Sequence, residues 1–187
     1  MRKVIYNMAV SLDGFTQTPD RKIDWIIVDE ELHTFWNAQA RAADAFIFGR
    51  RMYETMAVWP DIGRDPASEP VLIEYARIWE EKPKVVFSKT LKDVSWNSRL
   101  VRHDDIAVEV SNMKALPGNE MSVSGATLAA SFIKLGLVDE FQLFIQPVIL
   151  GAGTPFFPNL ESSRNLKLLE TRAFKSGVVY VRYEVAG

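Results

Sequence analysis

The sequence predicts an α/β fold with a central, mostly parallel mixed sheet, helices on both faces and an antiparallel C-terminal edge. Three observations lead to this prediction. Short apolar runs alternate with segments whose apolar residues recur at helical spacing. Glycine separates strand from helix at 45–57 and again at 121–135. From Val138 onward, apolar residues instead alternate with polar ones, which is typical of antiparallel strands.

The first half of the chain is expected to supply two strands and three helices. Both strands are apolar runs that end at a turn-forming glycine. The first helix begins at the carboxylates of 29–31, which stabilise a helix N-terminus through the macrodipole. The prolines and polar residues of 60–70 indicate a loop. The expected strands are 4–10 and 45–48, and the expected helices are 29–43, 51–57 and 72–79.

The second half repeats this pattern and then changes it. A helix that Asp104 or Asp105 can cap is stopped by Pro117-Gly118, and another follows the Ser124-Gly125 turn and ends at Gly136. Two strands with period-2 alternation are expected to pair antiparallel and close one edge of the sheet. The expected strands are 84–88, 100–102, 121–123, 141–145 and 179–185.

The composition describes one globular domain, 1–187. With 187 residues, 48% of them hydrophobic and 25% charged, the chain can bury a sizeable core. A net charge of −2 argues against a nucleic-acid partner. The lack of cysteine excludes disulfides, thiolate metal sites and cysteine nucleophiles. Because we find no signal sequence and no membrane-spanning run, we expect a cytoplasmic protein with no membrane partner.

Several kinds of catalytic site are not indicated. His33 and His103 have no partner at zinc-ligand spacing, so no metal site is expected. The serines lack a G-x-S-x-G elbow, which argues against a hydrolase. Gly151-Ala152-Gly153 follows a strand, but it lacks the third glycine and the helix of a dinucleotide fingerprint.

Three glycine-bearing turns follow expected strands: Ser11-Leu12-Asp13-Gly14, Gly49-Arg50-Arg51 and Ser124-Gly125-Ala126-Thr127. Open α/β sheets bind ligands at the carboxyl ends of their strands, where a helix start can hold phosphate. Ser88-Lys89-Thr90 adds a cation at the same end. Taken alone, each glycine is explained by the geometry of its turn. Arg50 and Arg51 are likewise explained as residues of a solvated helix face that pair with Glu54. Together, the turns predict a dinucleotide site with cations for an extra phosphate.

Four motifs stand in a recognisable order: 11–14, 49–54, 124–128, and Asp139-Glu140 followed by 147–153. They resemble the reductase domain of bacterial riboflavin biosynthesis, the C-terminal half of the bifunctional deaminase/reductase RibD. The resemblance covers nearly the whole chain and implies a three-layer fold of the dihydrofolate reductase-like superfamily. The zinc deaminase signature is missing, so the chain resembles the stand-alone relatives.

The resemblance implies NADPH lying across the carboxyl edge of the sheet. The nicotinamide would lie against Ala9, Ser11, Asp13 and Gly14. Phosphates would be held by Gly49, Arg50 and Arg51, with one arginine near the adenosine 2′-phosphate and help from Ser88 and Lys89. The pyrophosphate would meet the helix start at Ser124, Gly125, Ala126 and Thr127, where dihydrofolate reductases have a cis peptide bond.

Two residues are candidates for the proton source. Dihydrofolate reductases place a carboxylate on their first helix. Counting from Trp25 points to Glu30, whereas counting back from Gly49 points to His33. The carboxylates of 29–31 are better explained as a charged helix start than as catalytic groups. Trp25, Trp36 and Trp59 could form the wall of an aromatic substrate site, although core packing explains them as well.

The function implied by the resemblance is NADPH-dependent hydride transfer to a small pyrimidine or pterin, as in reduction of 5-amino-6-(5-phosphoribosylamino)uracil. The alternatives are dihydrofolate reductase activity and a catalytically inactive NADP-binding module. The loop 16–24 is expected to close over the site. The family implies a homodimer, for which 155–158 is a candidate contact, with a packed loop as the alternative.

Overall fold

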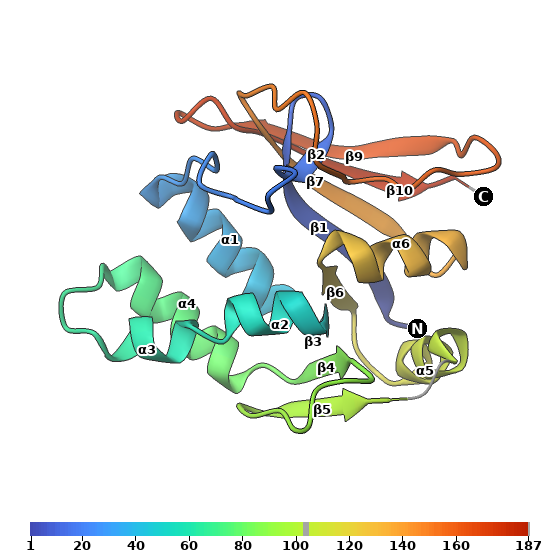
Figure 1. Ribbon diagram of the computed structural model, residues 1–187, viewed down its shortest axis with the longest axis horizontal. Helices are drawn as coiled ribbons and strands as arrows, with labels where there is room; N and C mark the ends of the chain where they lie inside the picture. Colours follow the sequence, from blue (N-terminus) through green and yellow to red (C-terminus); the bar gives the residue numbers. More distant parts are fainter. Residues whose placement is uncertain (103–104, 187) are drawn as a thin grey trace.

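The computed structural model describes residues 1–102 and 105–186, so His103 and Asp104 lie outside the described residues. The main sheet has eight strands in the order β5-β4-β3-β6-β1-β7-β10-β9 (Figure 1). Pairing is parallel from β5 to β7 and antiparallel at β7–β10 and β10–β9. The bounds are β1 Lys3–Ser11, β3 Ala45–Gly49, β4 Lys84–Phe87, β5 Ser98–Val101, β6 Glu120–Ser124, β7 Glu140–Gln146, β9 Leu166–Ala173 and β10 Val179–Val185.

Helices cover both faces of this sheet, which confirms the predicted three layers. Residues of α5 and α6 pack with Val4, Tyr6 and Ile47 in the larger core. On the other face, α1, α2 and α4 pack against Phe46 and Phe48. Figure 1 shows α1 to α4 on the left of the view and α5 and α6 on the right. The helices are α1 Glu30–Ala42, α2 Arg50–Met56, α3 Trp59–Arg64, α4 Pro70–Glu81, α5 Ile106–Ala115 and α6 Ala126–Lys134.

Most helix boundaries follow from the predicted signals. The Asp29 carboxylate caps α1 by accepting a hydrogen bond from the Leu32 N–H at 2.8 Å. Asp105 caps α5 through the Val108 N–H at 3.0 Å. None of the described helices combines the length and apolar character needed to cross a bilayer.

The loop prediction for 60–70 is wrong over its first part, where α3 forms. Pro60 stands in the first turn of this helix, and a backbone N–H has no intrahelical acceptor there, so proline is tolerated. Helix α3 packs on α4, and Arg64 pairs with Glu80 at 2.9 Å. Tertiary contact therefore stabilises a six-residue helix that the local sequence does not indicate.

The sheet extends one strand further than predicted. β10 pairs with β7 as expected, but β9 covers it and forms the edge. All eight residues of β9 are exposed, so its sequence lacks the alternation that marks a half-buried strand. A separate two-stranded sheet joins β2 Phe15–Gln17 to β8 Thr154–Pro155, which places the start of the predicted loop 16–24 in a strand.

The strand order brings the predicted turns to one edge. β3, β6 and β1 are adjacent and parallel, so their carboxyl ends lie side by side. Phe48, which precedes Gly49, is in register with Ser124. The turns after β3 and β6 therefore share one edge of the sheet with the end of β1.

Candidate functional site

A cavity of about 1160 Å³ opens at this edge. It reaches the carboxyl ends of β3, β6 and β1, the first turns of α2 and α6, and one face of α1. Eight of the predicted cofactor residues line it: Ala9, Gly49, Arg50, Arg51, Ser124, Gly125, Ala126 and Thr127. Sequence segments more than 100 residues apart thus form one hollow of a size that suits a small-molecule ligand.

The two glycines let helices α2 and α6 approach each other closely. Gly125 caps α6 with φ +97°, a conformation that side-chain-bearing residues rarely adopt. A β-carbon on Gly125 would lie 3.0 Å from Met52 Cβ, and one on Gly49 would lie 3.4 Å from Leu128 Cβ. Glycine here keeps the start of α6 open to a ligand. The described peptide bonds are trans, including the one between Ser124 and Gly125.

Arg50 and Arg51 lie side by side in the sequence but have different surroundings. Arg50 donates to Glu54 Oε1 at 2.8 Å and to Thr90 Oγ1 at 3.0 Å, which is the solvated-face pairing considered from the sequence. The Arg51 guanidinium has no hydrogen-bond or ion-pair partner among the described residues, although it lines the cavity. Arg51 is therefore the more available cation for an anionic ligand.

Ser11, Asp13 and Gly14 lie beside the cavity without lining it. Ser11 Oγ donates to Asp13 Oδ1 at 2.7 Å, and the Asp13 carboxylate accepts the N–H groups of Leu150 at 3.1 Å and Gly151 at 2.7 Å. These hydrogen bonds lower the pKa of Asp13, and the one from Ser11 contributes more than the two from backbone N–H groups. These side chains tie the end of β1 to the 150–151 turn, which explains their motif structurally.

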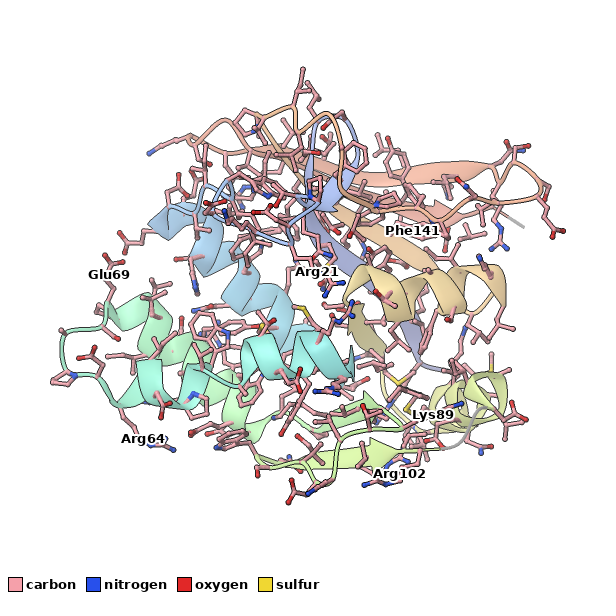
Figure 2. The ribbon with its side chains drawn as sticks, viewed as in Figure 1. Arg21, Arg64, Glu69, Lys89, Arg102 and Phe141 are labelled. Atoms are coloured by element: carbon pink, nitrogen blue, oxygen red, sulfur yellow. The ribbon has the colours of Figure 1, made fainter. Side chains whose placement is uncertain are left out.

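The segment after β4 reaches the cavity through Thr90, whereas Ser88 and Lys89 do not line it. Ser88 Oγ accepts the N–H groups of Thr90 at 3.2 Å and Leu91 at 3.0 Å, so its lone pairs serve the turn itself. Figure 2 shows Lys89 in this loop, on the opposite side of the molecule from Glu69. Thr90 belongs to the segment named from the sequence, but only Ser88 and Lys89 were assigned to the cofactor.

His33 lies on the cavity side of α1, buried and enclosed by the rings of Trp36, Trp59 and Tyr75 at 5.7–5.9 Å. Burial lowers its pKa, so the imidazole is neutral near pH 7. Asn37 fixes the tautomer. The Asn37 amide nitrogen donates to Val71 O at 3.0 Å and to Glu74 Oε2 at 2.7 Å, which turns its Oδ1 toward His33 Nδ1 at 3.1 Å.

This arrangement puts the proton of the neutral ring on Nδ1. Nε2 then keeps its lone pair, and it has no protein partner among residues 1–102 and 105–186. A group that contacts the ring from the cavity would therefore meet a nitrogen able to accept a hydrogen bond or, once protonated, to donate a proton.

The other predicted proton source lies elsewhere. Glu30 contributes to a separate hollow with Glu31 and Arg172 and does not line the main cavity. Its place at the start of α1 fits the charged helix start. Trp36 and Trp59 do line the cavity, whereas Trp25 does not and donates its indole N–H to Lys22 O at 3.2 Å.

Two sets of lining residues were not anticipated. One is a polar strip on the sheet face, where Asn7 donates to Ser122 Oγ at 2.8 Å and accepts from Ser124 Oγ at 2.8 Å, with Gln39 and Gln142 beyond. Its sequence signal is the polar Asn7 between Ile5 and Ala9 on one strand face. The other set comes from the loop after β2, of which 16–24 was expected to close over the site although no residue of it was named: Arg21, Ile23, Ile26 and Val28.

Comparison with known proteins identifies relatives of this chain. The sequence profile described as the RibD C-terminal domain matches residues 2–180. The uncharacterized protein YyaP of Bacillus subtilis (strain 168) is 35% identical over 187 residues, covering 100% of this chain and 96% of that protein.

Solved structures agree on the fold. A protein assigned to riboflavin biosynthesis in Shewanella sp. PV-4 superposes with a TM-score of 0.77 at 22% identity, covering 99% of both chains. Dihydrofolate reductase from Enterococcus faecalis, in complex with NADP(H), gives a TM-score of 0.66 at 12% identity, covering 99% of this chain and 97% of that one. At these identities the likeness concerns the fold, which is dihydrofolate reductase-like. By sequence, the chain belongs to the RibD C-terminal domain family.

Proposed function

We propose that the protein is an NADPH-dependent reductase that acts on a pyrimidine or pterin whose planar ring is uncharged. The observation that carries this proposal is the continuity of one cavity. It joins a phosphate-compatible end, formed by the starts of α2 and α6 with Arg51, to an aromatic end around His33. The cofactor would supply hydride to a C=N or carbonyl carbon of the substrate. The membership of the RibD C-terminal family and the NADP(H) complex of the Enterococcus enzyme support this choice.

The protein's part in this reaction would be to hold both ligands and to supply a proton. Ala9, near the end of β1, would border the nicotinamide, and the N–H groups at the start of α6 would bind the pyrophosphate, since both line the cavity. Trp36 and Trp59 would flank the substrate ring. His33, once protonated at Nε2, would donate the proton that balances hydride addition. Glu30 is the weaker candidate because the cavity does not include it.

The charges of the cavity favour an uncharged substrate ring over dihydrofolate. Its carboxylates are Glu54 and Glu120, and both are paired, with Arg50 at 2.8 Å and with Arg182 at 3.2 Å. Neither is free to bind a protonated pterin as the helix carboxylate of dihydrofolate reductases does. We therefore infer that the amides of the polar strip and His33 recognise the substrate, and that dihydrofolate reduction is at most a side activity.

The test is NADPH oxidation followed at 340 nm with 5-amino-6-(5-phosphoribosylamino)uracil and with dihydrofolate as substrates, next to cofactor binding by calorimetry. Oxidation with the pyrimidine and little with dihydrofolate is the expected result. Tight NADPH binding without oxidation of either compound would leave an inactive NADP-binding module as the better description. Failure to bind NADPH would overturn the proposal.

We further propose that the reductase acts in the cytoplasm as a homodimer. The contact expected at 155–158 needs revision, because Phe156 is 1% exposed and stacks on Tyr6 at 4.2 Å. Pro155 and Phe157 are exposed, Phe157 to 39%, and they are the parts of the segment that a partner could reach. Sedimentation of the intact protein and of Phe157→Ser tests the idea, which fails if the intact protein is monomeric.

A further inference from the structure

The loop that follows β2 carries a cation that no predicted role explains. Arg21 lines the cavity together with Ile23, Ile26 and Val28. The loop is fixed at both ends. On one side β2 pairs with β8, and on the other the Ile27 N–H donates to the buried side chain of Gln146 at 2.9 Å. Between these anchors, the loop holds Arg21 over the space shared by α1, α2 and α6 (Figure 2).

A hydrogen-bonded turn presents Arg21 in a strained conformation. The Arg21 N–H donates to Thr18 O at 2.8 Å, and Thr18 Oγ1 accepts the Lys22 N–H at 2.9 Å. Within this turn Arg21 adopts φ +65°, the left-handed region that favours glycine. A residue with a side chain in this region costs stability, and such strain gathers where a side chain is needed for function.

The charge of Arg21 is left free by its neighbours. The nearest carboxylate in sequence, Asp20, accepts from Thr18 Oγ1 at 2.5 Å and pairs with Lys22 at 2.9 Å. Among the described residues, the Arg21 guanidinium has neither a hydrogen-bond nor an ion-pair partner. Five unused N–H donors on a planar cation match the oxygens of a phosphate group.

We propose that Arg21 binds a phosphate group of a ligand in this cavity and holds the loop closed over it. The proposal rests on the proposed function, because that function brings the phosphates to the cavity. The group is either the pyrophosphate of the dinucleotide or a phosphate on the substrate. Both present the same chemistry to Arg21. A bound phosphate would also keep Ile23 and Val28, which belong to the same loop, at the cavity that they line.

The test uses three variants of the full chain: Arg21→Gln, Arg21→Gly and, as matched control, Lys22→Gln, which removes an adjacent exposed cation whose partner is Asp20. Binding of NADPH and NADH is measured by calorimetry. Ribose 5-phosphate and ribose are then titrated into protein saturated with NADP⁺. If the pyrophosphate is the partner, Kd rises about 5- to 30-fold for both dinucleotides in the Arg21 variants. If a substrate phosphate is the partner, ribose 5-phosphate binding is lost and dinucleotide binding is unchanged.

Thermal unfolding gives an independent readout. Arg21→Gly removes the cation and relieves the strained φ, so its Tm is expected to rise by about 2–4 °C while phosphate affinity falls. The proposal is overturned if all Arg21 variants bind every probe as the Lys22→Gln control does. That result, with NADPH binding and oxidation intact in the unmodified protein, would leave the proposed reductase function standing. Absence of NADPH binding in the unmodified protein would instead remove the function on which the proposal rests.

Discussion

Replacing Arg51 with glutamine should lower affinity for NADPH and leave affinity for NADH nearly unchanged. Arg51 lines the cavity and has no partner among the described residues, so it can bind the additional phosphate of NADPH without breaking an existing contact. A hydrogen bond to a charged group contributes about 1.5–3 kcal/mol when shielded. Arg51 is exposed, so we take about 1–2 kcal/mol, which corresponds to an increase in Kd of about 5- to 30-fold.

The assay is calorimetric titration of both dinucleotides into the intact protein and three variants. Arg50→Gln should cost less than Arg51→Gln, because Glu54 already offsets the Arg50 charge. Arg64→Gln is the control. Arg64, which Figure 2 shows on α3, pairs with Asp61 of the same helix and with Glu80 of α4, and it does not line the cavity. Equal losses for NADPH and NADH, or no loss in Arg51→Gln, would refute the assignment of Arg51 to the 2′-phosphate.

Three further predictions concern catalysis, the cofactor cradle and stability. His33→Gln should lower kcat/KM by about 100-fold or more and leave the affinity for NADPH unchanged. Turnover of the intact enzyme should rise below pH 6.5, because Nε2 then gains its proton. A flat pH profile would exclude His33 as the proton donor. Gly125→Ala, which strains φ +97° and crowds Met52, should weaken both dinucleotides at least fivefold by calorimetry, whereas unaltered affinity would place the pyrophosphate elsewhere. Burial lowers the pKa of Lys84 from 10.5 to about 8, so between these pH values the unfolded state binds more protons than the folded state. The free energy of unfolding, measured with urea, should therefore rise by on the order of 1–3 kcal/mol from pH 8 to 10. This rise should be absent in Lys84→Met.

Much of the fold could be predicted because its signals are local. The parallel strands are short apolar runs, and the glycines at the end of β3 and before α6 mark the strand-to-helix turns. The failures have a shared cause. α3 exists because it packs on α4, and its six residues are too few to show a helical period. β9 exists because it pairs with β10, and its eight exposed residues show no alternation. Local periodicity cannot indicate an element that distant residues stabilise.

The candidate site was predictable to the level of the backbone. Adjacent parallel strands bring their following turns together, so the grouping of Gly49 with Gly125 follows from topology. The direction in which each side chain points does not follow from the topology. Asp13 turns to the 150–151 backbone, and Glu30 lies outside the cavity that includes His33. Arg21 was missed because its availability depends on Lys22 and Thr18 occupying Asp20, which the sequence does not reveal.

The central claim is that one cavity holds both the dinucleotide and the group to be reduced. A crystal structure of the protein with NADP⁺ tests it most directly. We predict the nicotinamide against Ala9 with its free face toward His33, the pyrophosphate at the N–H groups of 125–127, and the 2′-phosphate within hydrogen-bonding distance of Arg51. A dinucleotide bound outside this cavity, or a cavity that stays empty at saturating NADP⁺, would contradict the account.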